Sequence, residues 1–117
     1  MFITNIVFMA LLQNASLIYT DIYLTTKPSL EAGFVENNLI AKPFFDKGLY
    51  NEAYILSLIG NSAIAYGLYL IDDSSELSLI ALQLIAVIEI YAIHNNCHYN
   101  DSLSNIQANA VLIYLTF

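Results

Sequence analysis

The stretch AYILSLIGNSAIAYGLYLI, residues Ala53–Ile71, decides the fold because it contains no Asp, Glu, Lys or Arg. An apolar stretch of about 18 or more residues without charges is typical of a transmembrane helix. A second charge-free stretch follows at Leu77–Ile88. Only 11% of the 117 residues are charged, whereas an ordinary soluble domain has about 25%. A soluble chain of this length has too much surface for so few charges. The sequence therefore predicts an integral membrane protein of the all-α class.

The apolar segments predict one transmembrane helical domain over residues 1–117, a bundle of three to four membrane-spanning helices. The expected spans are Ile3–Thr25, Ala53–Ile71, Leu77–Ile93 and Leu103–Phe117. The last is shorter than the about 20 residues that a span requires. It therefore tilts, enters from the interface or is completed by neighbouring protein, and the alternative is three spans with an interfacial tail.

Polar residues mark where the first and third helices are expected to end. Lys27-Pro28 is predicted to stop the first helix, because proline disfavours helical backbone at the preceding residue. The run His94-Asn95-Asn96 is predicted to end the third helix.

The connection Thr26–Glu52 is long and contains all three lysines of the chain. The positive-inside rule places such a loop in the cytoplasm. Its apolar residues predict an amphipathic segment that lies in part on the membrane surface: Leu39, Ile40, Phe44 and Phe45.

Composition excludes several classes of function. The net charge is −7 and the chain has no arginine, which argues against nucleic acid as a partner, because binding nucleic acid requires clustered basic residues. The predicted helices use nearly the whole length and leave no room for a soluble catalytic domain. The sequence has no Gly-rich phosphate loop, nucleophile elbow, paired CxxC or HExxH. We therefore expect no cofactor and no catalysis by this chain itself.

Polar residues inside the first span share one helical face. Asn14, Asp21 and Thr25 follow at steps of seven and four, which an α-helix brings to one side. A carboxylate at membrane depth is costly and usually faces the bundle interior or an aqueous cavity. Asp21 is therefore either a proton or ion site, or a residue near the interface that orders the following loop through backbone amides.

The second and third spans also contain polar residues. Asn61 is expected to form an interhelical hydrogen bond, and the small pair Ala63 and Gly67 to allow close helix packing. Gln83 and Glu89 lie in the third span. Glu89 has three readings: a proton-relay carboxylate, a metal ligand, or a structural hydrogen-bond acceptor. The polar helix contacts are thus predicted at Asn14, Asp21, Asn61, Gln83 and Glu89.

His94 and His98 have the i, i+4 spacing that can hold a metal ion on a helix. If a metal binds, the expected ligands are His94, His98 and Glu89, with Asp21 or Cys97 as further candidates. The favoured reading is that the chain has no metal site, because histidine and cysteine near a helix end are common without one.

The sequence Asp21-x3-Thr25, followed by Gly33-x2-Glu36-x-Asn38, resembles an uncharacterised family of small prokaryotic multi-helix membrane proteins with D-x3-T and G-x2-E-x-N-P motifs. Leu39 stands where that family has proline. The resemblance covers the N-terminal half and implies a helical membrane fold without an assigned activity. It also implies that Glu36 and Asn38 fold back toward Asp21 and Thr25.

Two functions from different classes remain. The first is a non-catalytic accessory subunit of a larger membrane complex, whose partners are other integral membrane subunits and lipid. By compositional analogy, that complex is a respiratory complex or a copper monooxygenase of the ammonia-oxidising type. The second is a small oligomeric transporter or proton-conducting protein that uses intramembrane carboxylates. The expected location is the plasma membrane of a prokaryote.

Overall fold

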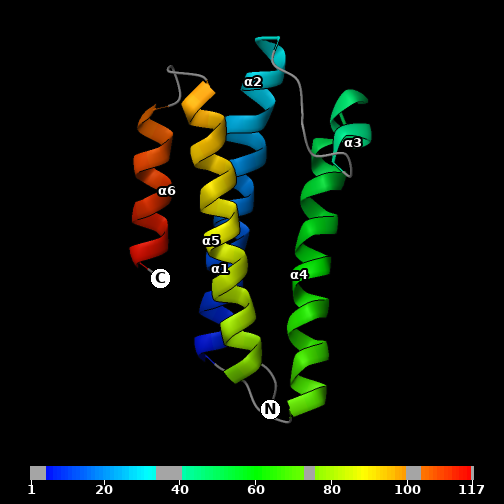
Figure 1. Cartoon of the computed structure of the whole chain (residues 1–117). Coiled ribbons are helices and arrows are strands. Elements are labelled where there is room, and N and C mark those ends of the chain that lie inside the picture. Colours follow the sequence, from blue (N-terminus) through cyan, green and yellow to red (C-terminus); the bar gives the residue numbers. More distant parts are fainter. Residues whose placement is uncertain (1–4, 34–40, 73–75, 100–103, 117) are drawn as a thin grey trace.

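The computed structural model describes residues 5–33, 41–72, 76–99 and 104–116. In chain order its elements are α1 (Asn5–Tyr19), the π-helix η1 (Thr20–Thr26), α2 (Lys27–Glu31), α3 (Lys42–Asp46), α4 (Tyr50–Asp72), α5 (Glu76–Tyr99) and α6 (Ser104–Thr116). The predicted all-α bundle is confirmed over these residues (Figure 1).

Three helices are long and apolar enough to cross a membrane. They comprise Ile6–Glu31, Tyr50–Ile71 and Glu76–Cys97, with mean hydropathies of 1.3, 1.5 and 1.9. The chain therefore belongs to the class of helical membrane proteins. The 13 residues of α6 extend only about 20 Å, which is less than the about 30 Å hydrocarbon core of a bilayer.

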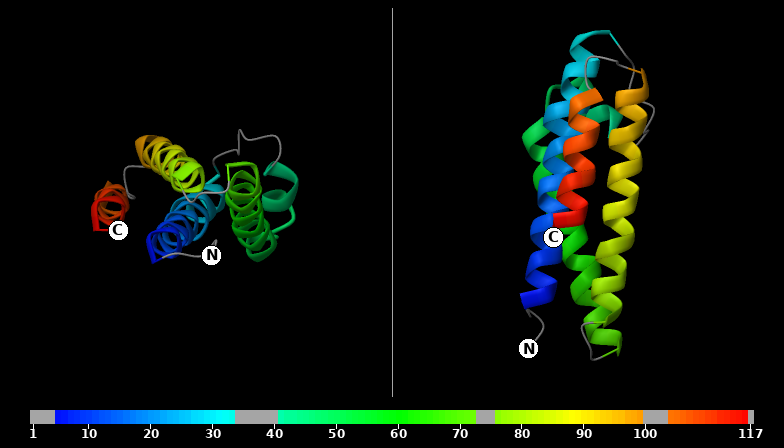
Figure 2. Two further views of the ribbon diagram at one scale, coloured as in Figure 1. Left: turned by 90° about the horizontal axis from the view of Figure 1, so that it is seen from below. Right: turned by 90° about the vertical axis from the view of Figure 1, so that its left-hand side faces the viewer.

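The helices form a thin bundle with extents of 46 × 29 × 17 Å. The α5 helix packs against α1, α4 and α6. Seen end-on, α4 and α6 lie on opposite sides of the α1–α5 pair (Figure 2). Small residues are buried at the contacts, where they let helices approach closely: Ala10, Ala65, Ala86 and Ala110.

The prediction that Lys27-Pro28 ends the first helix was wrong, because helical backbone continues to Glu31. Proline lacks an N–H group and disrupts the interior of an α-helix. Here η1 ends at Thr26, and Pro28 falls in the first turn of α2, where a missing N–H is tolerated. The helix instead ends at Glu31, and Gly33 follows with a φ of +99°, which suits a residue without Cβ.

The third helix does not end at His94 either, since α5 continues to Tyr99. Asparagine commonly ends helices because its side chain competes for backbone hydrogen bonds. The Asn96 amide instead bonds to side chains on η1, which removes that competition.

The predicted amphipathic loop is in part a packed element. Lys42–Asp46 forms α3, and Phe45 is buried with Ile18 and Ile22 rather than lying on a membrane surface. Leu39 and Ile40 lie outside the described residues. All three lysines lie toward one end of the bundle, near α2 and α3 (Figure 1), and the cytoplasmic location of that end stays a prediction.

Candidate functional site

The π-helix η1 brings the polar side chains of Asp21, Thr25 and Thr26 to one face. In an α-helix, Asp21 and Thr26 would be separated by about 140° around the axis. The wider π turn, with i→i+5 hydrogen bonds such as Lys27 N–H to Ile22 C=O, places residue i+5 above residue i. Thr26 can therefore donate a hydrogen bond to the Asp21 carboxylate, with 3.3 Å between Oγ1 and Oδ1.

Asn96 on α5 joins this face of η1 across the helix–helix contact. Its Nδ2 lies 2.8 Å from Thr25 Oγ1 and 3.0 Å from Thr26 Oγ1. The same atom lies 3.1 Å from Asp21 Oδ1. An amide nitrogen has two N–H groups, so three oxygens share two donors. Asn96 therefore fixes the π-helical turn against α5.

Glu89 lies on α5 beside the same group. Its carboxyl group interacts with that of Asp21. Its Oε2 atom is buried and has no hydrogen-bond partner. The two intramembrane carboxyl groups that the sequence singled out are thus brought together, although they are far apart in the chain.

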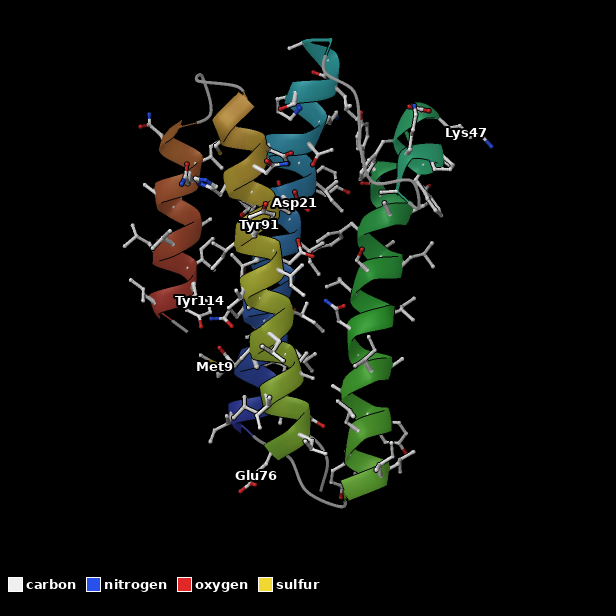
Figure 3. All side chains as sticks on the ribbon, in the orientation of Figure 1. Met9, Asp21, Lys47, Glu76, Tyr91 and Tyr114 are labelled. Carbon is white, nitrogen blue, oxygen red and sulfur yellow. The ribbon has the colours of Figure 1, made fainter. Side chains whose placement is uncertain are left out.

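A cavity of ≈ 430 Å³ adjoins the carboxyl pair. Asp21 and Glu89 both line it, and the remaining polar wall residues are Thr26, Ser57, Tyr91, Asn95 and Asn96. Figure 3 shows Asp21 and Tyr91 at the same level of the bundle. Because the Tyr91 side chain is 69% exposed, the cavity extends to the surface of the chain.

A second polar contact connects the three long helices. Buried Asn14 donates to the Leu82 carbonyl on α5, with an N···O distance of 3.1 Å. It accepts a hydrogen bond from Asn61 of α4 at 3.3 Å. An α-helix would place Asn14 and Asp21 on the same face. In the structure they take part in two separate interhelical contacts.

Gln13, which sequence reasoning missed, connects α1 to both α5 and α6. It is 1% exposed, and its Nε2 donates to the Tyr114 carbonyl at 3.0 Å. Gln83 Nε2 in turn donates to Gln13 Oε1 at 3.4 Å. The signal in the sequence was a second polar side chain directly beside Asn14 within an uncharged segment.

Of the three metal ligands expected from the sequence, the two whose side chains are described, Glu89 and His94, have different neighbours, and no group of three potential ligands occurs among the described residues. Glu89 faces Asp21 on η1, whereas His94 Nδ1 lies 2.6 Å from Gln107 Nε2 on α6. The His98 side chain lies outside the described residues. Glu36 and Asn38, expected near Asp21 and Thr25, also fall outside them.

The chain matches no protein-family model, no curated protein and no solved structure. Its class therefore follows from the fold and the site alone: a helical membrane protein with a carboxyl pair beside a polar cavity.

We expect Asn96→Ala to loosen η1 locally. Loss of the amide removes about 1 kcal/mol of hydrogen bonding, so backbone amide exchange in residues 20–26 should rise roughly fivefold. Hydrogen–deuterium exchange with mass spectrometry measures this. Asn95→Ala is the matched control, because Asn95 is the exposed neighbour. Equal exchange in both variants would contradict the role of Asn96.

Proposed function

We propose that this chain is a non-catalytic accessory subunit of a larger integral membrane complex. The observation that carries the proposal is the outward face of α4. The α4 span is the least buried of the three, with 6% of its apolar window inside the protein. A Cβ atom added at Gly60 or Gly67 would meet no atom within 4 Å, so neither glycine serves packing within the described chain.

The small residues on this face follow a helix-pairing pattern, spaced four, three, four and three residues apart: Leu56, Gly60, Ala63, Gly67 and Leu70. We call these five residues the α4 seam. Such spacing is that of helices that pack side by side, and small residues allow close approach between transmembrane helices. The partner that this seam fits is a transmembrane helix of another subunit.

The location that we propose is the cell membrane of a prokaryote. Respiratory and copper monooxygenase complexes, the ammonia-oxidising type included, are the assemblies in which we would search first. This choice rests on compositional analogy with their small helical subunits.

Gly60→Leu is expected to release the chain from its complex. A Cβ at this position meets no other atom of the described chain within 4 Å, so a leucine side chain starts outward from the α4 seam. Native membranes would be extracted in mild detergent, separated on a native gel and analysed by mass spectrometry. We expect co-migration of the unmodified chain with larger subunits, and at least about tenfold less for Gly60→Leu, which corresponds to a loss of about 1.4 kcal/mol.

Ser62→Leu is the matched control for this experiment. Ser62 is exposed on the same helix but lies outside the α4 seam, so its variant should co-migrate normally. Equal co-migration of the Gly60 and Ser62 variants would refute the seam as the interface. Migration of the unmodified chain alone would refute the accessory role.

The alternative is a small oligomeric transporter or proton-conducting protein, which the carboxyl pair beside the cavity favours. Flux across vesicles that contain the purified protein would test it. Conduction that is lost in Glu89→Gln supports this alternative, and equal flux in both proteins rejects it.

A further inference from the structure

The contact between Asp21 and Glu89 has a chemical requirement. An ionised carboxylate only accepts hydrogen bonds. A hydrogen bond between the two interacting carboxyl groups therefore requires that one of them carries a proton. Two ionised carboxylates in contact would instead repel each other, as like charges sharing one site do.

The buried oxygen of Glu89 is a second and separate observation. Its Oε2 exposes less than 1 Å² and has no hydrogen-bond partner. A buried polar atom without a partner is costly and calls for an explanation. This atom belongs to a residue that lines the cavity, and a proton bound to the carboxyl group would give its oxygens a donor.

No basic side chain is among the described residues that line the cavity beside the pair. Among the described residues that line the cavity, the titratable ones are Asp21 from η1 and Glu89 and Tyr91 from α5. Ala41 and the wall residues from α3 and α4 do not titrate: Phe45, Ala53 and Ser57. A carboxylate pair at membrane depth without a basic neighbour is expensive, and one proton removes half of its charge.

We propose that Asp21 and Glu89 form a proton-binding site that holds a single proton between two carboxyl groups and exchanges it through the adjoining cavity. On uptake, hydronium in the cavity transfers its proton to a carboxyl oxygen. One O–H bond forms, one O–H bond of hydronium breaks, and a water molecule remains. The pair then carries one negative charge instead of two.

The arrangement fits a proton better than a metal ion. Calcium takes about six to eight oxygen ligands, and the pair offers two carboxyl groups. Asn96 directs its amide N–H toward Asp21 Oδ1, and an N–H group is a donor that repels a cation. The same donor stabilises the carboxylate that remains after the single proton is bound.

Infrared difference spectroscopy of the full-length protein in lipid nanodiscs tests this site without requiring transport. A protonated carboxyl group has its own C=O stretching band, which shifts in D2O. Near neutral pH we expect one such band in the unmodified protein. Asp21→Asn and Glu89→Gln should each abolish it, because the remaining carboxylate can then accept from an amide N–H instead.

Glu76→Gln is the matched control, since Glu76 is an exposed carboxyl on the same helix, and it should keep the band. Circular dichroism of each variant verifies that the helices are intact. If one of the two variants, Asp21→Asn or Glu89→Gln, loses its helices, the other variant still tests the carboxyl pair. Persistence of the band in both folded variants would overturn the proposal. So would a band that appears only after Na⁺ is withdrawn, because a metal ion would then occupy the site.

This inference does not depend on the accessory role. Co-migration tests the α4 seam, the infrared band tests the carboxyl pair, and either result can fail while the other stands.

Discussion

Asn14→Leu is expected to lower the free energy of unfolding by about 1–3 kcal/mol, the typical cost of leaving buried hydrogen-bonding groups without a partner. Asn14 is 1% exposed and connects α1 to the Leu82 carbonyl and to Asn61. Leucine has the same number of side-chain heavy atoms, branched at the same position, so the substitution removes the hydrogen bonds without creating empty space. A single interhelical hydrogen bond within a membrane contributes modestly to stability, but this substitution removes two of them together.

Unfolding in mixed micelles with increasing sodium dodecyl sulfate, followed by circular dichroism, measures this loss. Asn109→Leu is the matched control, because Asn109 is exposed on α6 and should unfold at the midpoint of the unmodified protein. If both variants unfold at the same midpoint, Asn14 does not hold the three helices together.

The fold class could be predicted because it depends on composition over long segments. The absence of charge from Ala53–Ile71 is a property of many residues, and no local detail reverses it. Helix ends depend on single side chains and on what they contact. The backbone stays helical at Pro28 only because the π-helix η1 ends just before it. The α5 helix continues through Asn96 only because side-chain oxygens on η1 accept hydrogen bonds from its amide.

The candidate site could be predicted in part. Asp21 and Glu89 stood out as carboxyl groups in apolar surroundings, and they line the same cavity. The contact of Asp21 with Thr26, by contrast, requires the rotation of η1 relative to an α-helix. A pattern with a period of 3.6 residues does not contain that rotation. The 3.6-residue period placed Thr25 on the same helical face as Asp21, but it did not place Thr26 there.

Polar residues in this bundle fall into two groups with different consequences. Asn14 and Gln13 have their hydrogen-bonding partners on neighbouring helices, which is the ordinary role of amides in membrane bundles. Glu89 retains a buried oxygen without a partner. An amide whose hydrogen-bonding groups have partners contributes to helix packing. A carboxyl group with an oxygen that has no partner marks a place where a proton can bind. The structure thus distinguishes Asn14 from Glu89, which the sequence predicted alike as polar helix contacts.

Ala86→Leu is expected to destabilise the bundle by about 1–3 kcal/mol through overpacking. Ala86 is fully buried in a cluster with Leu17 of α1 and Ala110 of α6, so it lies where α5 meets both neighbours. The larger side chain forces these helices apart, because small residues set the separation of transmembrane helices. The detachment of α6 should come first, since that helix is too short to span a bilayer by itself.

The same titration with sodium dodecyl sulfate measures the loss of stability, and hydrogen–deuterium exchange over residues 104–116 measures the release of α6. Ala108→Leu adds the same atoms on the exposed side of α6 and should leave both readings unchanged. If Ala86→Leu instead matches this control, the α5–α6 contact has room for three more carbon atoms. The 1% exposure of Ala110 argues against such room.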